Sequence, residues 1–271
     1  MNTLERKMVD VLKDLRENHH VCGIKAEFEA EGTRMEEAMR LKEVITMAGL
    51  GLTMKIGGCE AIRDMYEARV LGVERVVAPM VETAFALKKY LKAVANVFPA
   101  EEREFLEVAV NIETIEGYHN FESMMELPEI SLLDGVVMGR VDLTGSMGLG
   151  RDDINTDVVF DITADMFTKA KARHKGTAVG GGVAKEALPF FKKLKPGLLD
   201  RYETRKIIFK CPDALENDPE KGILKAVGFE LLWLKNKRDY YGMIYNEDKL
   251  RIEMLEKRYK QLIEEAGGKY E

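Results

Sequence analysis

Acidic and basic side chains recur in this sequence directly after short apolar runs, where the strands of a parallel β-sheet would end. These positions are Glu27, Glu29, Lys55, Pro79, Glu113, Asp142, the turn at 180–182 and the charged run at 203–206. In a (β/α)8 barrel the catalytic groups lie at the carboxyl ends of the strands. The pattern therefore predicts a polar site with carboxylates and lysine, and not an apolar binding funnel.

Glu113 and Asp142 are the two carboxylates best placed to share one ligand. Glu113 closes an apolar strand, and Asp142 follows another strand after a short turn. Magnesium commonly takes one or two protein carboxylates and keeps water and substrate oxygens for its other positions. The pair indicates a divalent metal site, with Mg²⁺ as the first choice and Mn²⁺ as the second. The alternative is two unrelated loop carboxylates, one of which caps the helix after it.

Short β-rich runs alternate with helical segments along most of the chain. Strands are predicted at 23–28, 52–56, 75–79, 106–112, 135–138, 176–179 and 206–209, and helices at 34–47, 61–71 and 83–94. This alternation is typical of βα units with a parallel sheet and right-handed crossovers. Seven to eight such units favour a closed (β/α)8 TIM barrel, in which one strand is short, irregular or replaced by a helix. No Gly-x-Gly-x-x-Gly follows the first strand, so a dinucleotide site is not expected.

Both ends of the chain have helical patterns. We expect one domain over residues 1–271, with an N-terminal helix at 1–20, the barrel core at 21–210 and a helical extension at 211–271. The apolar faces of the end helices comprise Leu4, Met8, Val11, Leu12 and Leu15, and Ile252, Leu255, Tyr259, Leu262 and Ile263. Two interpretations stay open: these helices cover the outside of the barrel, or the C-terminal ones pack on a neighbouring subunit.

Composition excludes several classes of protein. A net charge of −6 argues against a dedicated nucleic-acid surface. No apolar run approaches the roughly 20 residues that a membrane helix needs. The first residues lack an apolar signal core, which predicts a cytoplasmic protein, and three scattered cysteines indicate reduced thiols. All four histidines lie outside the strand ends, so no histidine is expected to act in catalysis or in a metal site.

Two runs of sequence resemble the HpcH/HpaI aldolase/citrate lyase family. One is Val110-Asn111-Ile112-Glu113-Thr114, and the other is LDGVVMGRVDLTGSMG at 133–148. The family typically shows a strand that ends in Glu-Thr, then Asp-Gly-(apolar)-Gly-x-x-Asp-Leu and a Ser-x-Gly. The stretch from Lys55 to Val81 also fits its strand–helix–strand pattern, and the similarity covers residues 21–210.

This resemblance implies a barrel of the phosphoenolpyruvate/pyruvate superfamily that uses a divalent metal, with Glu113 and Asp142 as its ligands. Backbone N–H groups around Gly139, Arg140 and Val141 would hold a pyruvate-type carboxylate, and Pro79 would lie in the same substrate pocket. The implied activity is a carbon–carbon lyase of class II aldolase type, acting next to the enolate of pyruvate or a related 2-oxo acid. A metal there acts as a Lewis acid on the developing negative charge.

Two other functions remain open beside this one. One is a citrate-lyase-like cleavage of a hydroxy-acid thioester, although no clear coenzyme A site is evident. The other is a barrel that binds a metal and a small anion without turnover. Related barrels commonly form trimers or hexamers by exchanging C-terminal helices, so a homo-oligomer is expected.

The chain departs from the family pattern at the supporting groups. Lys55 stands where an arginine is usual, Arg140 replaces a common proline, and the run Glu27-Phe28-Glu29-Ala30 lacks the histidine of the aldolase branch. Lys55 is therefore an enolate-stabilising cation, a structural partner of Glu113 or Glu27, or a Schiff-base nucleophile with a depressed pKa. Glu29 is a candidate general base.

Two further features have a structural and a functional interpretation. The glycines at 180–182 form a tight turn, or they let the backbone approach an anion at a helix N-terminus. The charges at 201–206 come just before the predicted strand at 206–209. They would then lie on the stability face of the barrel, as an ion network or a subunit contact.

Overall fold

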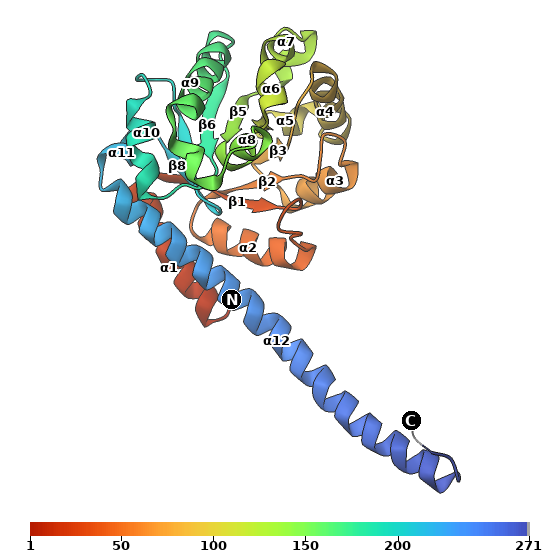
Figure 1. Cartoon of the computed structure of the whole chain (residues 1–271). Coiled ribbons are helices and arrows are strands. Elements are labelled where there is room, and N and C mark those ends of the chain that lie inside the picture. The colour runs from red at the N-terminus through yellow and green to blue at the C-terminus, as the bar shows by residue number, and fades with distance from the viewer. Residues whose placement is uncertain (270–271) are drawn as a thin grey trace.

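Eight strands close a barrel in the order of the chain, as the computed structural model of residues 1–269 shows (Figure 1). The strands are β1 (Val21–Glu27), β2 (Gly51–Lys55), β3 (Arg75–Ala78), β4 (Glu107–Ile112), β5 (Gly135–Gly139), β6 (Gly176–Gly180), β7 (Arg201–Glu203) and β8 (Ile207–Lys210). Neighbouring strands from β1 to β7 pair in parallel. The predicted fold class, a (β/α)8 TIM barrel with N- and C-terminal helical extensions, is confirmed.

Helices cover the outside of this barrel. They are α1 (Thr3–His19), α2 (Met35–Met47), α3 (Ile62–Leu71), α4 (Ala84–Val97), α5 (Ala100–Arg103), α6 (Ile115–His119), α7 (Phe121–Met125), α8 (Arg140–Ser146), α9 (Asp157–Ala172), α10 (Leu188–Lys193), α11 (Asp213–Glu216) and α12 (Pro219–Glu265). Short 3-10 turns are η1 (Pro128–Leu132), η2 (Arg151–Asn155) and η3 (Lys185–Ala187). No helix within residues 1–269 combines the length and the apolar character needed to cross a membrane.

The strand sequences separate an outer apolar face from an inner polar face. In β1, Ile24 and Ala26 are fully buried in the hydrophobic core. Because strand side chains alternate, the intervening Lys25 and Glu27 point to the other face, and both line a cavity in the barrel mouth. The alternation that forms the core thus also places charged groups inside the barrel.

The last strand, β8, departs from the parallel sheet that was predicted. β8 pairs antiparallel with both β7 and β1. The amino end of β8 therefore lies at the same mouth as the carboxyl ends of the other strands. The prediction that the charges at 201–206 lie on the stability face is wrong for Glu203, Thr204 and Arg205, which line the mouth cavity.

The short strand β7 is the one that the sequence pattern did not reveal. It has only three residues, and its outward side chain Tyr202 is sandwiched between two aromatic rings. The ring centroids lie 4.7 Å from Phe209 and 5.3 Å from Phe191. Stacking of this kind adds to the free energy of burial and fixes the strand against α10 and β8.

The N-terminal helix α1 and the first half of α12 pack together beside the barrel (Figure 1). Asn2 caps α1, since its side chain accepts the Glu5 N–H at 2.9 Å while the Glu5 carboxylate accepts the Asn2 N–H at 2.7 Å. The buried side of α12 runs from Gly222 to Asn236. Beyond that point α12 leaves the barrel as a protruding stalk.

Three charged side chains meet at the opposite end of the barrel, where strands β3, β4 and β7 begin. Glu107 accepts hydrogen bonds from Arg201 Nη1 at 2.7 Å and lies 3.3 Å from Arg75 Nε. The Arg75 side chain is only 6% exposed, so its charge has little access to water. This cluster closes the bottom of the barrel.

Replacing Glu107 with glutamine should destabilise the protein by about 2–3 kcal/mol, because it leaves two partly buried guanidinium groups without a counter-charge. Urea unfolding followed by circular dichroism measures this change. The matched control is Glu102→Gln, which breaks the exposed ion pair with Arg69 and should have a much smaller effect on the free energy of unfolding. Equal effects of the two substitutions would contradict a special role for the buried cluster.

Candidate active site

The carboxyl ends of the strands surround a cavity of about 300 Å³. Its polar lining brings together residues from five strands, β1, β2, β4, β5 and β7, and the segments that follow them: Lys25, Glu27, Glu29, Lys55, Asn111, Glu113, Asp142, Arg151, Glu203, Thr204 and Arg205. None of the four histidines is among the lining residues. Sequence reasoning predicted five of these side chains as strand-end groups, namely Glu27, Glu29, Lys55, Glu113 and Asp142.

Glu113 is the most deeply placed carboxylate at this mouth, with its side chain 2% exposed. Its Oε1 accepts the Met80 N–H at 3.1 Å, and its Oε2 accepts a hydrogen bond from Asn111 Nδ2 at 2.8 Å. Gly139 of β5 makes room for it, since a Cβ built there would lie 2.4 Å from Glu113 Oε2. The Glu113 carboxylate can therefore pack here only because position 139, at the end of β5, is a glycine.

Asp142 lies in the first turn of α8, which starts directly after β5 without the predicted intervening turn. Its negative charge is near enough to raise the pKa of Glu113. Burial is the largest cause of that raised pKa, and the ammonium of Lys55 only partly offsets it. Glu113 and Asp142 thus face one cavity, and burial makes the ionised form of Glu113 energetically unfavourable.

Lys55 Nζ lies 2.9 Å from Glu29 Oε2 and 3.4 Å from Glu113 Oε1. Burial alone would lower the pKa of Lys55, but the carboxylates of Glu113, Glu29 and Glu27 outweigh that effect and raise it. A Schiff-base lysine needs a depressed pKa, so this environment disfavours the nucleophile interpretation. The ion-pair and cation interpretations both agree with the geometry.

A second lysine in the cavity was missed from the sequence. Lys25 Nζ lies 2.9 Å from Glu203 Oε1 and 3.3 Å from Glu27 Oε1. Burial acts against its charge, but the two carboxylates prevail and raise the pKa of Lys25. The signal was available, because Lys25 precedes Glu27 by two residues and therefore shares its face of the strand.

The remaining predicted substrate residues are divided between the cavity and the protein interior. Gly139 and Val141 line the cavity, whereas Pro79 is buried and its neighbour Met80 lines the cavity instead. Met80 has a positive φ of 51°, which directs its N–H towards Glu113. The strand end was correctly located, but the lining residue is one position further along the chain.

The side chain of Arg140 points away from the cavity and is fully buried. It donates to the carbonyl oxygens of Gly180 at 3.2 Å and Gly181 at 2.9 Å, and to Asn155 Oδ1 at 2.6 Å. Burial without a carboxylate partner lowers its pKa to about 10. Arg140 therefore fixes the loop after β6 against η2, and it is not among the residues that line the cavity.

Gly181 fits closely against the start of α8. It has a φ of 78°, and a Cβ there would lie 2.8 Å from Arg140 N and 2.7 Å from Val141 N. The predicted tight turn is present, and Gly181 packs directly against the first N–H groups of α8. The predicted approach of this backbone to an anion stays a prediction.

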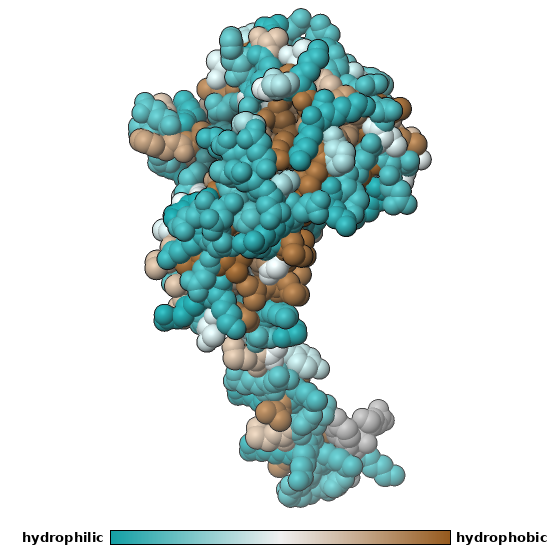
Figure 2. All heavy atoms as spheres, turned by 90° about the vertical axis from the view of Figure 1, so that its left-hand side faces the viewer, coloured by the Kyte–Doolittle hydropathy of each residue, from teal (hydrophilic) through white to brown (hydrophobic). Residues whose placement is uncertain are grey.

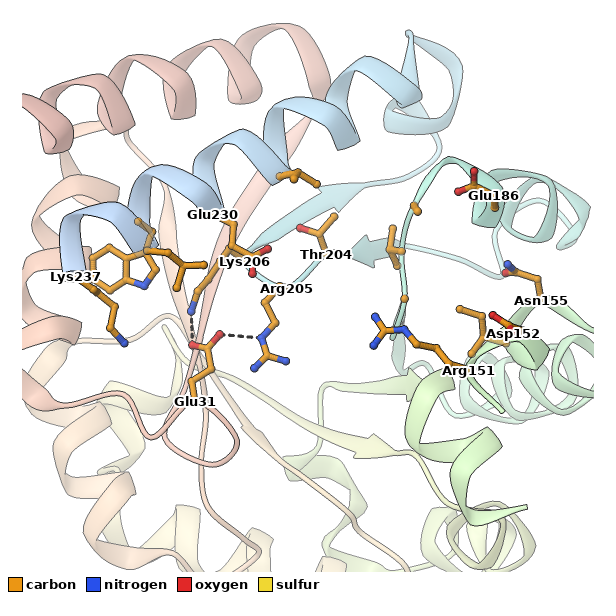
Figure 3. Close-up of a pocket in the computed structure, with 17 residues that line it drawn as sticks. Glu31, Arg151, Asp152, Asn155, Glu186, Thr204, Arg205, Lys206, Glu230 and Lys237 are labelled. Carbon is orange, nitrogen blue, oxygen red and sulfur yellow. Dashed lines mark hydrogen bonds and ion pairs between the residues drawn. The ribbon is translucent and has the colours of Figure 1, made fainter. Parts of the chain in front are cut away.

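A larger groove of about 890 Å³ adjoins the cavity and is shown in Figure 3. Arg151, Gly182, Val183, Thr204 and Arg205 line both spaces. On one wall Glu31 pairs with Lys206 and with Arg205, the latter at 3.0 Å. The opposite wall carries Arg151 and Asp152, and α12 contributes Glu230 and Lys237.

The donor set fits a divalent cation. Within residues 1–269 no three His, Cys, Asp or Glu side chains come together as a metal cluster. The two predicted ligands, Glu113 and Asp142, both line the cavity. Hard oxygen donors of this number suit Mg²⁺, which leaves its other positions to water and substrate oxygens. Repulsion between the two carboxylates would be relieved by a cation held between them.

Gly139→Ala should disrupt the site, because its methyl group would overlap the Glu113 carboxylate. We expect a loss of about 1–3 kcal/mol in the free energy of unfolding, which is typical of overpacking. Gly145→Ala, in the helix that follows, is the control, since nothing lies within 4 Å of a Cβ there. Denaturant unfolding compares the two, and a neutral Gly139→Ala would contradict the packing described above.

Glu113→Gln should raise the thermal midpoint of the metal-free protein at pH 8, because it removes a buried carboxylate whose ionised form is disfavoured. A raised folded-state pKa means that stability is greatest below the ordinary value of 4.5 and declines as the pH rises through the folded value. The advantage of the variant should therefore shrink as the pH falls towards 4.5. Thermal melts in EDTA between these pH values test this, and a midpoint lowered equally at every pH refutes it.

Comparisons with known proteins agree with this architecture. A search of curated protein sequences gave no match. The crystal structure of citrate synthase SbnG superposes with a TM-score of 0.58 at 15% identity, covering 86% of this chain and 90% of that one. An HpcH/HpaI aldolase/citrate lyase family protein from Burkholderia cenocepacia J2315 gives a TM-score of 0.53 at 15% identity, covering 68% and 88%. At such identities these structures establish the fold alone.

The sequence itself matches a family model over a shorter range than the resemblance suggested. The model describes the HpcH/HpaI aldolase/citrate lyase family and matches residues 58–186. This segment contains Glu113, Gly139 and Asp142, whereas Glu29 and Lys55 precede it. The match supports a lyase-type enzyme in general terms. The predicted resemblance is confirmed, since residues 58–186 match the model of the HpcH/HpaI aldolase/citrate lyase family.

Proposed function

We propose that this protein is a metal-dependent carbon–carbon lyase of aldolase type, which cleaves or forms a bond next to the enolate of pyruvate or a related 2-oxo acid. One observation carries the proposal: Glu113 and Asp142 face the same small cavity at the barrel mouth, with Lys55 beside them. A cavity of about 300 Å³ suits a small acid and not a polymer.

Glu113 and Asp142 would hold the cation. When bound, a divalent metal there would supply Lewis-acid stabilisation of the negative charge that develops on a keto oxygen. Asn111 and the Met80 N–H hold the Glu113 carboxylate in one orientation. The N–H groups of Arg140 and Val141, at the start of α8, would orient the carboxylate of the substrate.

Lys55 would add a fixed positive charge near the reacting oxygen. Its raised pKa keeps the ammonium charged, and its position between Glu29 and Glu113 restrains it. An ammonium lacks the planar fork of the arginine that is usual in the family, so it stabilises charge without a bidentate contact.

Glu29 would act as the general base. It follows β1, lines the cavity, and its Oε2 lies 2.9 Å from Lys55 Nζ. A carboxylate in this place could take a proton from a donor in the cavity.

A binding barrel without turnover is the second candidate, and one contact favours it. Lys55 Nζ already lies 3.4 Å from Glu113 Oε1, so an internal cation partly neutralises the carboxylate that a metal would need. In such a protein the two carboxylates would bind metal and anion, and no proton would leave the substrate.

Exchange of the methyl protons of pyruvate with deuterium, followed by NMR with Mg²⁺ or Mn²⁺, tests the proposal. We expect metal-dependent exchange in the parent and a loss of at least about 100-fold in Glu113→Gln and Asp142→Asn, since each removes a ligand charge. Glu102→Gln and Asp157→Asn are matched controls in exposed ion pairs and should keep full activity.

A paramagnetic titration with Mn²⁺ separates the two candidates. Exchange that is lost together with Mn²⁺ binding in both site variants supports the lyase. Mn²⁺ and pyruvate binding without exchange in the parent indicates the binding barrel. Unchanged Mn²⁺ affinity in both variants overturns the ligand assignment.

A further inference from the structure

The helix α12 extends far beyond the surface that it covers. It has 47 residues, and its buried residues end at Asn236. At 1.5 Å per residue the helix is about 70 Å long, and its second half protrudes from the barrel (Figure 1). An isolated helix of this kind gains little stability from propensity alone.

A second apolar stripe runs along α12, distinct from the side that packs on the barrel. Its positions alternate at spacings of three and four residues: Leu224, Val227, Leu231, Leu234, Arg238, Tyr241, Tyr245, Asp248, Ile252, Leu255, Tyr259 and Leu262. We call these twelve positions the seam. The period of 3.5 residues is the heptad pattern of a left-handed coiled coil.

The seam faces solvent along most of its length. Leu224 is 70% exposed, Leu234 is 52% exposed and Leu255 is 46% exposed. Figure 2 shows apolar side chains gathered on the protein where the stalk leaves the barrel and again along the stalk. The side of α12 that packs on the barrel does not continue as an apolar stripe along the stalk, because Glu247 and Lys257 interrupt it after Met243. The seam is therefore the more continuous of the two apolar stripes, and most of its apolar side chains are exposed in the single chain.

We propose that the seams of two copies of this chain pair as an antiparallel coiled coil, with a two-fold axis beside Met243. In this register Leu224 lies opposite Leu262 of the partner subunit, and Leu231 lies opposite Leu255 of the partner subunit. Leu234 lies opposite Ile252 of the partner subunit. Every seam position then has a counterpart, and no apolar position faces a charged one.

Charge complementarity selects this orientation. The only two charged seam residues are Arg238 and Asp248, and the two-fold axis beside Met243 places Arg238 opposite Asp248 of the partner subunit. A parallel pair in register would instead place Arg238 opposite Arg238 and Asp248 opposite Asp248. Charged groups at core positions commonly specify register and orientation in this way. In the single chain Arg238 is 72% exposed and pairs with the adjacent Asp239.

The seam residue Tyr241 also contacts the barrel. The Tyr241 hydroxyl donates to Glu37 Oε1 at 2.6 Å, and its ring lies 4.8 Å from the Arg34 guanidinium. These contacts use the hydroxyl and one face of the ring. They fix the direction of the stalk at the point where it leaves the barrel.

The pairing brings the partner to the mouth of the barrel. Val227 and Leu234 of the seam line the groove of about 890 Å³ that adjoins the mouth cavity. The far half of the partner helix would lie along these residues, with Ile252 of the partner subunit against Leu234. Each copy would therefore supply a wall of the other's groove.

Charge reversal in the full-length chain tests the proposal by sedimentation equilibrium. Arg238→Glu and Asp248→Lys each place like charges opposite one another, and each should weaken dimerisation by about tenfold or more, or at least 1.4 kcal/mol. The double variant restores opposite charges and should return the dissociation constant to within about threefold of the parent. Lys257→Glu and Glu264→Lys, off the seam on the same helix, should leave it unchanged.

Disulfide trapping tests the orientation independently of charge. Leu231→Cys combined with Leu255→Cys should give a covalent dimer on oxidation, whereas Leu231→Cys alone should behave as the parent with its native cysteines. Cross-linking by Leu231→Cys alone indicates a parallel pair and overturns the proposal. So does a parent that is monomeric at the concentrations of the reversal experiment, or a double charge variant that fails to recover.

Discussion

Charges inside the barrel must compensate one another, and this constraint underlies most of the structure. At the bottom of the barrel Glu107 pairs with Arg75 and Arg201. At the mouth Lys25 pairs with Glu203, and Lys55 pairs with Glu113. A buried charge without a partner is strongly destabilising, so each of these groups depends on the strand register that aligns it with its neighbour. Glu113 is the exception, because the positive charge of Lys55 only partly offsets the effect of burial and the pKa of Glu113 stays raised. The proposed metal site would need this property before a cation binds.

The strand ends could be predicted because alternation of apolar and polar residues is a local property. Lys55, Glu113 and Asp142 all follow or end strands with clear patterns, and their convergence is a consequence of parallel pairing. The errors arose where the pattern is short or the chain reverses. β7 is too brief to show alternation, and nothing in the residues at 204–206 reveals that β8 returns antiparallel. The position of the Arg140 side chain also depends on distant loops, which no local spacing encodes.

The two most conspicuous departures from the family pattern have different structural meanings. Arg140 in place of proline has become part of the scaffold, since its guanidinium holds the loop after β6 and no longer competes for the substrate side. Lys55 in place of arginine remains in the cavity. It keeps the positive charge but lacks the bidentate geometry, so in the proposed function the backbone N–H groups would supply the specificity for a carboxylate. The glycines at 139 and 181 supply the space that such a backbone approach needs.

The C-terminal helix would connect the proposed dimer interface to this mouth. Its first half is anchored by contacts with α1 and the barrel, so its direction is fixed by the same core that holds the strands. A rigid helix carries that direction outward over its whole length, and the seam winds around it with a heptad period. If a second copy binds the seam, the groove beside Arg205 and Lys206 is enclosed by both chains. Access to the cavity would then depend on the dimer interface as well as on the barrel. The apolar seam would lie next to the polar mouth because it forms that interface.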